Sequence, residues 1–266
     1  MTLWAETNGS GPDLVLVHGW GVNSGVWDSV LPLLTRRYRV TCVDLPGHGG
    51  SAATAMPASL DALAGQVAEI VPRSALWLGW SLGGLVCLRI ATLVPERVVA
   101  LMLSNTTPKF TRAADWPHAM PVTQLDAFAT ELAQDFAGTV KRFLSLQVLG
   151  DERARETLRA LRDSVLSRGQ PDVASLATGL GILRDSDLRE QLHDIAIPTL
   201  VMTSPYDRLT PQAAGEYMAN RIENAKPVSF PRTAHAPFIS HPAGFLQAVN
   251  EFADTVLTHR VHAHAH

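Results

Sequence analysis

The chain has 266 residues, of which 46% are hydrophobic and 18% are charged, and its formal net charge at pH 7 is -3. This composition is ordinary for a soluble globular protein, and the length suits one domain with an insertion or two small domains. The negative net charge argues against general affinity for nucleic acid. No apolar run approaches the roughly 18 residues that span a bilayer, and the first residues lack the pattern of a signal peptide. We therefore expect a cytoplasmic protein without a membrane segment.

Apolar runs of strand length recur through the first hundred residues, with helix-like segments between them. They lie at residues 14–17, 39–43, 75–78 and 98–104. Continuous apolar strands are typical of a parallel sheet that helices cover on both faces. The predicted fold class is therefore α/β. The two cysteines, Cys42 and Cys87, lie in apolar segments and are expected to be reduced core thiols.

The pattern becomes helical after the fourth predicted strand. Apolar residues then recur at helical spacing, at Leu125, Phe128, Leu132, Phe136 and Val140. Strand-like runs return at residues 197–202 and 227–230, and an amphipathic helix follows over residues 242–257. We expect a core made of residues 1–105 and 187–266, with residues 106–186 inserted as a helical cap.

Gly79-Trp80-Ser81-Leu82-Gly83 is the most informative motif. It follows an apolar run and precedes a helix-like segment. In this context G-x-S-x-G predicts a nucleophile elbow, a tight turn that presents the serine hydroxyl above the sheet. The glycines on either side avoid a clash where strand and helix converge. Ser81 is thus the candidate nucleophile, and it needs a base, an acid and an oxyanion hole.

Candidates for the acid and the base follow later strands, in the order Ser, Asp, His. Asp207 comes after the run at residues 197–202, and His235 comes after the last predicted strand. Neutral His235 would accept the Ser81 proton, and Asp207 would hold the tautomer of the imidazole. The alternative for Asp207 is a turn aspartate before a helix. His18 is interpreted as a brace of the oxyanion loop, and His241 as structural.

Two backbone N–H groups are expected to form the oxyanion hole. Leu82 supplies one at a helix N-terminus, and Trp20, in the loop after the first apolar run, supplies the other. The alternative for Trp20 is a plain core aromatic. No metal-ligand cluster, phosphate loop or dinucleotide fingerprint accompanies these groups, so we expect no metal and no cofactor. The histidine-rich residues 259–266 are expected to be a disordered tail without a role.

These residues resemble the α/β-hydrolase superfamily over nearly the whole chain, which implies the α/β-hydrolase fold and acyl transfer to water. The segments 16–23, 43–47, 76–86 and 234–242 are similar to the BioH family, the pimeloyl-[acyl-carrier protein] methyl ester esterases. The resemblance implies a serine carboxylesterase that releases methanol from a methylated pimeloyl chain on acyl-carrier protein, in biotin synthesis. We expect it to act as a monomer.

The resemblance also implies the substrate-binding residues. These are Trp20, Ser81, Leu82, Phe143, Leu144, Ser145, Leu146, Gln147 and His235. An apolar tunnel lined by Trp20, Leu82, Phe143 and Leu146 is expected to hold the methylene chain.

Basic residues of the cap are the expected docking site for the acidic carrier protein. Residues 138–168 carry seven basic and four acidic side chains, a net charge of +3. The docking candidates are Arg142, Arg155, Arg159 and Arg162, of which the last three share one helix face. The alternative is a solvated face paired with its own acids. Gly138 stands where the family pattern has a further arginine, so one contact is absent or is replaced by Lys141.

Other functions stay open at this point. A generalist short-chain carboxylesterase or a carbon–carbon bond hydrolase would use the same three residues. A non-catalytic binding protein of the same fold normally has a broken triad, whereas all three positions are filled here.

Overall fold

The computed structural model describes residues 2–263. Seven strands of this part of the chain form one sheet in the order β1-β3-β2-β4-β5-β6-β7. Their bounds are β1 Ala5–Asn8, β2 Asp13–Val17, β3 Arg39–Val43, β4 Ala75–Trp80, β5 Val98–Ser104, β6 Thr199–Thr203 and β7 Ala225–Ser229. β1 pairs antiparallel with β3, and the other neighbouring strands pair in parallel. The carboxyl ends of the parallel strands therefore meet at one edge.

Burial explains which strands are central. Every residue of β4 is buried, as are the last four residues of β2 and of β3. β7 is largely exposed and contains Pro227, which suits a strand at the edge of the sheet, where a missing N–H costs no ladder bond.

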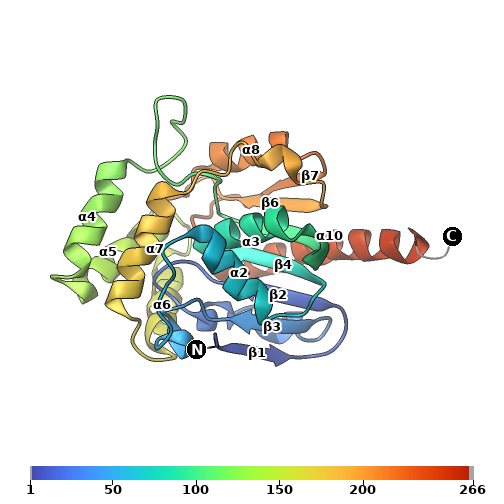
Figure 1. Ribbon diagram of the computed structural model, residues 1–266, viewed down its shortest axis with the longest axis horizontal. Helices are drawn as coiled ribbons and strands as arrows, with labels where there is room; N and C mark the ends of the chain where they lie inside the picture. The colour runs from blue at the N-terminus through green and yellow to red at the C-terminus, as the bar shows by residue number, and fades with distance from the viewer. Residues whose placement is uncertain (1, 264–266) are drawn as a thin grey trace.

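Helices cover the sheet on both faces, with α2 and α3 in front of it and α10 passing behind it in Figure 1. The helices of the core are α1 Leu31–Leu34, α2 Leu60–Glu69, α3 Leu82–Leu93, α8 Gln212–Arg221, α9 Pro237–Ser240 and α10 Pro242–Ala263. α2 shows how sequence sets the packing. Ser59 accepts a hydrogen bond from the Ala62 N–H and starts the helix. Residues at helical spacing then form its buried face: Leu60, Leu63, Ala64, Val67 and Ala68.

Four helices between β5 and β6 form the cap, which gathers at one end of the sheet, on the left in Figure 1. They are α4 Val122–Leu132, α5 Phe136–Gln147, α6 Ala154–Leu166 and α7 Val173–Asp185. The hydrophobic core runs without a break from the sheet into the cap, where it includes Phe128, Phe143 and Leu180. The exact limits 106 and 186 of a separate cap domain stay a prediction.

The structure also bears on the membrane segment, the cysteines and the histidine-rich tail. None of the helices within residues 2–263 combines the length and the apolar character that a membrane span requires. Cys42 and Cys87 are both free and buried. The expectation of a disordered tail is wrong for residues 259–263, which belong to α10, and residues 264–266 lie outside the described part of the chain.

Candidate active site

Ser81 lies between the end of β4 and the start of α3, in a strained backbone conformation. Its φ is 56° and its ψ is -119°, a region that residues with a side chain rarely adopt. Hydrogen bonds on both sides hold the turn. The Ser81 N–H donates to the Ser104 carbonyl (3.1 Å), and the Thr106 hydroxyl donates to the Ser81 carbonyl (2.7 Å). Ser104, the last residue of β5, and Thr106, two residues further along, therefore hold the elbow in this conformation.

The glycines around Ser81 are required by close packing. A Cβ atom on Gly83 would collide with the carbonyl oxygens of Val17 and His18, and one on Gly79 would collide with the Gly83 carbonyl. The first turn of α3 thus lies directly against the end of β2, which brings the helix N-terminus beside the loop that follows this strand.

His235 and Asp207 form a buried pair. The His235 Nδ1 lies 2.7 Å from Asp207 Oδ2, and both side chains are fully buried. Burial alone would raise the pKa of Asp207. The charge of His235 and hydrogen bonds from His235 and Thr210 outweigh that effect, so the pKa of Asp207 lies below its usual value. Asp207 is therefore an acceptor for the Nδ1 proton.

Asp207 has further donors that the sequence analysis missed. The Asn105 side-chain amide donates to Oδ2 (2.8 Å), and so does the Thr210 hydroxyl (2.6 Å). The backbone N–H groups of Leu209 and Thr210 donate to Oδ1 (2.9 and 3.0 Å). Asn105 directly follows β5 and has a φ of 44°. A polar residue after a strand was the available signal, but nothing in the chain order paired it with Asp207.

The other ring nitrogen of His235 is free. Nε2 is buried and has no hydrogen-bond partner among the described residues, so no bond to Ser81 is formed. Trp80 restrains His235. Its indole N–H donates to the His235 backbone carbonyl (2.7 Å), and the centroids of the two rings lie 5.3 Å apart.

The loop that carries Trp20 abuts the elbow. A Cβ atom on Gly19 would lie 3.1 Å from the Ser81 Cβ and 3.0 Å from the Trp80 ring. The Trp20 indole N–H donates to the Leu176 carbonyl of α7 (2.8 Å), and its ring packs edge-on against Phe143 at 4.6 Å. Trp20 is thus held by the cap, while its backbone lies near Ser81. Leu82 is the first residue of α3.

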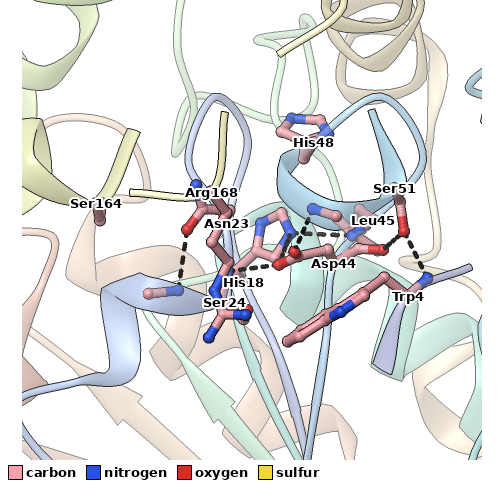
Figure 2. Close-up of polar contacts among 12 residues, drawn as sticks. Trp4, His18, Asn23, Ser24, Asp44, Leu45, His48, Ser51, Ser164 and Arg168 are labelled. Carbon is pink, nitrogen blue, oxygen red and sulfur yellow. Dashed lines mark hydrogen bonds and ion pairs between the residues drawn. The ribbon is translucent and has the colours of Figure 1, made fainter. Parts of the chain in front are cut away.

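Two buried histidines support this loop, and Figure 2 labels both of them together with Asp44. His18 Nδ1 bonds to the Gly19 carbonyl (2.7 Å), and His18 Nε2 accepts from the Leu45 N–H (3.0 Å). His48 Nε2 accepts from the Gly21 N–H (3.2 Å). Burial lowers the pKa of His18, although Asp44 opposes the shift. Both rings therefore act as neutral acceptors for backbone N–H groups.

A small apolar cavity opens above Ser81. Its volume is about 10 Å³, and it is lined by Ser81, Phe110, Met120, Leu125, Phe143, Leu183 and Leu209. Of the predicted substrate residues, only Ser81 and Phe143 are among its lining. Leu209 lies in the loop that follows β6 and carries Asp207. Leu125, Phe143 and Leu183 come from the cap helices, and Phe110 and Met120 come from the segment between β5 and α4.

The other predicted cap residues lie elsewhere on α5. Ser145 and Leu146 line a groove of about 600 Å³ on the outer side, together with Gln124, Phe128, Gly138, Lys141 and Arg142. Leu144 lines a second groove of about 280 Å³ beside Arg162. Gln147 is buried, and its carbonyl accepts the His235 N–H (2.9 Å). The structure thus does not bring Ser145 and Leu146 to the cavity at Ser81.

The arginines predicted to dock the carrier protein differ in their partners. Arg142 is paired with Glu131 and lies 3.8 Å from Asp135, and Arg159 lies 3.8 Å from Asp163 one turn along α6. Arg155 is exposed and forms no ion pair with a described residue. Part of this basic surface is therefore neutralised by the cap's own acids. Within residues 2–263, no group of three or more His, Cys, Asp or Glu side chains is placed to hold a metal ion.

The sheet, the strained serine at the carboxyl end of β4 and the His–Asp pair packed against the preceding Trp80 define the class of the protein as an α/β hydrolase. A model described as "Alpha/beta hydrolase family" matches residues 14–248. A solved hydrolase from Pseudomonas aeruginosa superposes with a TM-score of 0.83 at 32% identity, over 94% of each chain.

Curated relatives narrow the class to one family. A pimeloyl-[acyl-carrier protein] methyl ester esterase of Nitrosomonas europaea is 46% identical over 242 residues, which are 91% of this chain and 95% of the relative. The protein of the same name from Photobacterium profundum is 43% identical over 93% of this chain and 96% of its own. The chain belongs to the family of the pimeloyl-[acyl-carrier protein] methyl ester esterases.

Proposed function

We propose that this protein is a serine carboxylesterase that hydrolyses pimeloyl-[acyl-carrier protein] methyl ester to methanol and free pimeloyl-[acyl-carrier protein], in biotin synthesis. The observation that carries the proposal is the buried His235–Asp207 pair beside the strained Ser81, in a chain whose curated relatives bear that name. Action as a cytoplasmic monomer stays a prediction.

The reaction begins at the free nitrogen of His235. Nε2 accepts the proton of the Ser81 hydroxyl as its oxygen attacks the ester carbonyl, and Asp207 stabilises the imidazolium through Nδ1. His235 then donates that proton to the methoxide oxygen, and methanol leaves. Water attacks the resulting acyl-enzyme by the same steps in reverse, which frees the carboxylate.

The negative charge on the carbonyl oxygen needs donors fixed in advance. The Leu82 N–H lies at the N-terminus of α3, and the Trp20 N–H lies in the loop packed against Ser81. Removal of one such donor typically slows an acyl transfer by about 10²- to 10³-fold.

The lining of the cavity supports an apolar acyl chain as the substrate. Phe110, Met120 and Leu183 surround Ser81 with hydrocarbon, and their burial against methylene groups would contribute about 0.8 kcal/mol for each CH₂. A volume of about 10 Å³ holds no such chain, so binding requires the lining side chains of the cap to move apart.

The carrier protein is expected to dock outside the cavity on Arg142, Arg155, Arg159 and Arg162. Arg142 lies in the outer groove beside Lys141, where Gly138 leaves the surface without a third basic side chain. The competing function is a generalist short-chain carboxylesterase or a carbon–carbon bond hydrolase, which needs the same triad but no docking surface.

Ser81→Ala tests the assignment directly. We expect kcat for methanol release to fall by about 10⁴-fold or more, because the nucleophile is lost. The melting temperature should change little, since alanine keeps the Cβ atom at the strained position. Rates are measured on methyl pimeloyl-[acyl-carrier protein], on p-nitrophenyl butyrate and on a dienone acid, and in growth rescue of a biotin-requiring strain that lacks this esterase.

Each result has a clear consequence. Retention of methyl ester hydrolysis by Ser81→Ala would disprove the nucleophile. Turnover of the aryl ester or the dienone acid at a much higher kcat/KM than the carrier-protein substrate, without growth rescue, would favour the competing function.

A further inference from the structure

The backbone before the catalytic histidine is attached to the cap. Residues 230–235 lead from the end of β7 to the imidazole. Three of them bond to residues 147–152, which run from the last residue of α5 toward α6 and are called the clamp turn below. The His235 N–H donates to the Gln147 carbonyl (2.9 Å), and the Arg232 carbonyl accepts from the Glu152 N–H (3.1 Å). The remaining bond comes from a side chain.

That side chain is Asp151. Its Oδ2 accepts the Ala234 N–H at 3.0 Å, and its Oδ1 accepts the Arg153 N–H at 2.8 Å. The residue is 7% exposed, and its carboxylate forms no ion pair with a described residue. Burying a carboxylate is costly unless hydrogen bonds compensate, and bonds to a carboxylate are stronger than bonds between neutral groups. The buried Asp151 carboxylate therefore fixes the N–H group of Ala234, the residue directly before His235.

The histidine loop needs such a restraint because its backbone is strained. Arg232 has a φ of 59°, in the left-handed region. On the side of the core, the Asn105 amide donates to the Ala234 carbonyl (3.3 Å), and the Trp80 indole donates to the His235 carbonyl (2.7 Å). The core thus holds the carbonyl groups of residues 234 and 235, and the clamp turn holds their N–H groups.

We propose that Asp151 is a positioning residue for His235, which sets the imidazole relative to Ser81 by fixing the Ala234 amide from the cap. The proposal rests on the proposed function, because it takes His235 as the base. Misplacement of a catalytic group by as little as 1 Å can cost about 100-fold in rate. The effect of Asp151 should therefore appear in kcat and not in substrate binding.

Asp151→Ala, measured with p-nitrophenyl butyrate, tests the proposal. Active sites are counted by labelling Ser81 with a fluorophosphonate, and kcat is expressed per labelled site. We expect kcat to fall about 10- to 100-fold with KM unchanged, and the rate of Ser81 labelling to fall in parallel. Labelling slows because it also needs His235 to take the Ser81 proton.

Asp135→Ala is the matched control. Asp135 starts the cap helix α5 by accepting the Gly138 N–H (2.8 Å), as Asp151 accepts the Arg153 N–H ahead of α6. Its loss removes a helix-capping carboxylate without touching the histidine loop. A lowered melting temperature, with kcat and labelling rate at the wild-type level, is the expected result.

The outcomes separate the two claims. If kcat per site and the labelling rate of Asp151→Ala stay within twofold of wild type, Asp151 is only a structural residue and the inference is overturned. If Asp151→Ala does not fold, Asp151→Asn decides by the same criterion, because it keeps the volume and replaces one acceptor by an N–H donor. Failure of the proposed function looks different: the wild-type protein would then leave methyl pimeloyl-[acyl-carrier protein] intact, whatever the labelling rates.

Discussion

Buried imidazoles hold the oxyanion loop only in their neutral form. His48 Nδ1 bonds to the Pro46 carbonyl (2.8 Å), so Nε2 carries the lone pair that accepts the Gly21 N–H. A proton on Nε2 would face this donor. Burial and the neighbouring His18 lower the pKa of His48 to about 3. The loop beside Ser81 is therefore sensitive to acid at a point outside the triad.

Stability should depend on pH through His48. Between the ordinary histidine pKa and about 3, the unfolded chain binds a proton at this position and the folded chain does not. The free energy of unfolding therefore falls as the pH falls through this window, by at most about 1.4 kcal/mol per pH unit for one such proton. His48→Gln keeps an acceptor for Gly21 and removes the titrating group. Urea unfolding between pH 6 and 4 should give a slope smaller by up to that amount.

His18 contributes to the same pH dependence of stability. Its lowered pKa acts in the same direction, so some pH dependence remains in His48→Gln. An unchanged slope in His48→Gln would contradict the account, because the proton uptake would then belong to other groups.

The proposed triad could be predicted from the sequence because each of its residues follows a strand in a fixed chain order. Asn105 and Asp151 could not. Their partners Asp207 and Ala234 lie 102 and 83 positions later in the chain, and only the folded topology brings them together. Local patterns carry no information on contacts at that separation.

At the scale of elements, apolar strands were predictable and polar ones were not. The predicted runs 39–43 and 98–104 coincide with β3 and β5. β1 has the sequence AETN, its four residues are all exposed and it pairs antiparallel at the edge of the sheet, so it has no apolar signal. β7 starts two residues before its predicted position, at Ala225.

Helical periodicity in the sequence predicted a helical cap, but it did not show which helix faces line the cavity at Ser81. Phe110 and Met120 line the cavity from the irregular segment before α4, in which apolar residues follow neither a helical nor a strand period. Leu146 has the right spacing to lie beside Phe143, yet it lines the outer groove. Spacing defines one face of a helix, whereas the neighbour of that face depends on how four helices pack.

The contact between α3 and β2 gives a prediction at this scale. Gly83→Ala places a methyl group against the carbonyl oxygens of Val17 and His18, which cannot rotate away as a side chain would. We expect a loss of about 1–3 kcal/mol in the free energy of unfolding, measured by urea denaturation.

Gly65→Ala on α2 is the control for the effect of alanine itself. Gly65 has no atom within 4 Å of the position of an added Cβ, so alanine should stabilise the protein by about 0.5–1 kcal/mol through helix propensity. Equal stability of the two variants would show that α3 can move away from β2, and the close packing of the elbow would not be needed.

At the scale of the whole molecule, one segment of the cap, residues 138–168, differs in the sign of its charge from the chain as a whole. The chain has a net charge of -3, while residues 138–168 carry +3. Such an arrangement attracts an acidic partner to one end of the molecule and repels it from the others. Arg142 already has acidic neighbours, whereas Arg155 faces solvent without an ion pair to a described residue. Arg155 is therefore available to act on a docking partner, as is Arg162, which is also exposed and has no ion pair to a described residue.

Arg155→Glu should weaken docking without affecting chemistry. We expect kcat/KM for methyl pimeloyl-[acyl-carrier protein] to fall several-fold at low ionic strength, and the difference from wild type to shrink as salt screens the charges. Hydrolysis of p-nitrophenyl butyrate should stay the same at every salt concentration, because this ester needs no docking surface. Arg73→Glu makes the same change of charge in an exposed position before β4, at the edge of the sheet away from the cap, and should leave both substrates unaffected. If the two variants lose rate equally on the carrier-protein substrate, net charge and not a cap surface governs the encounter.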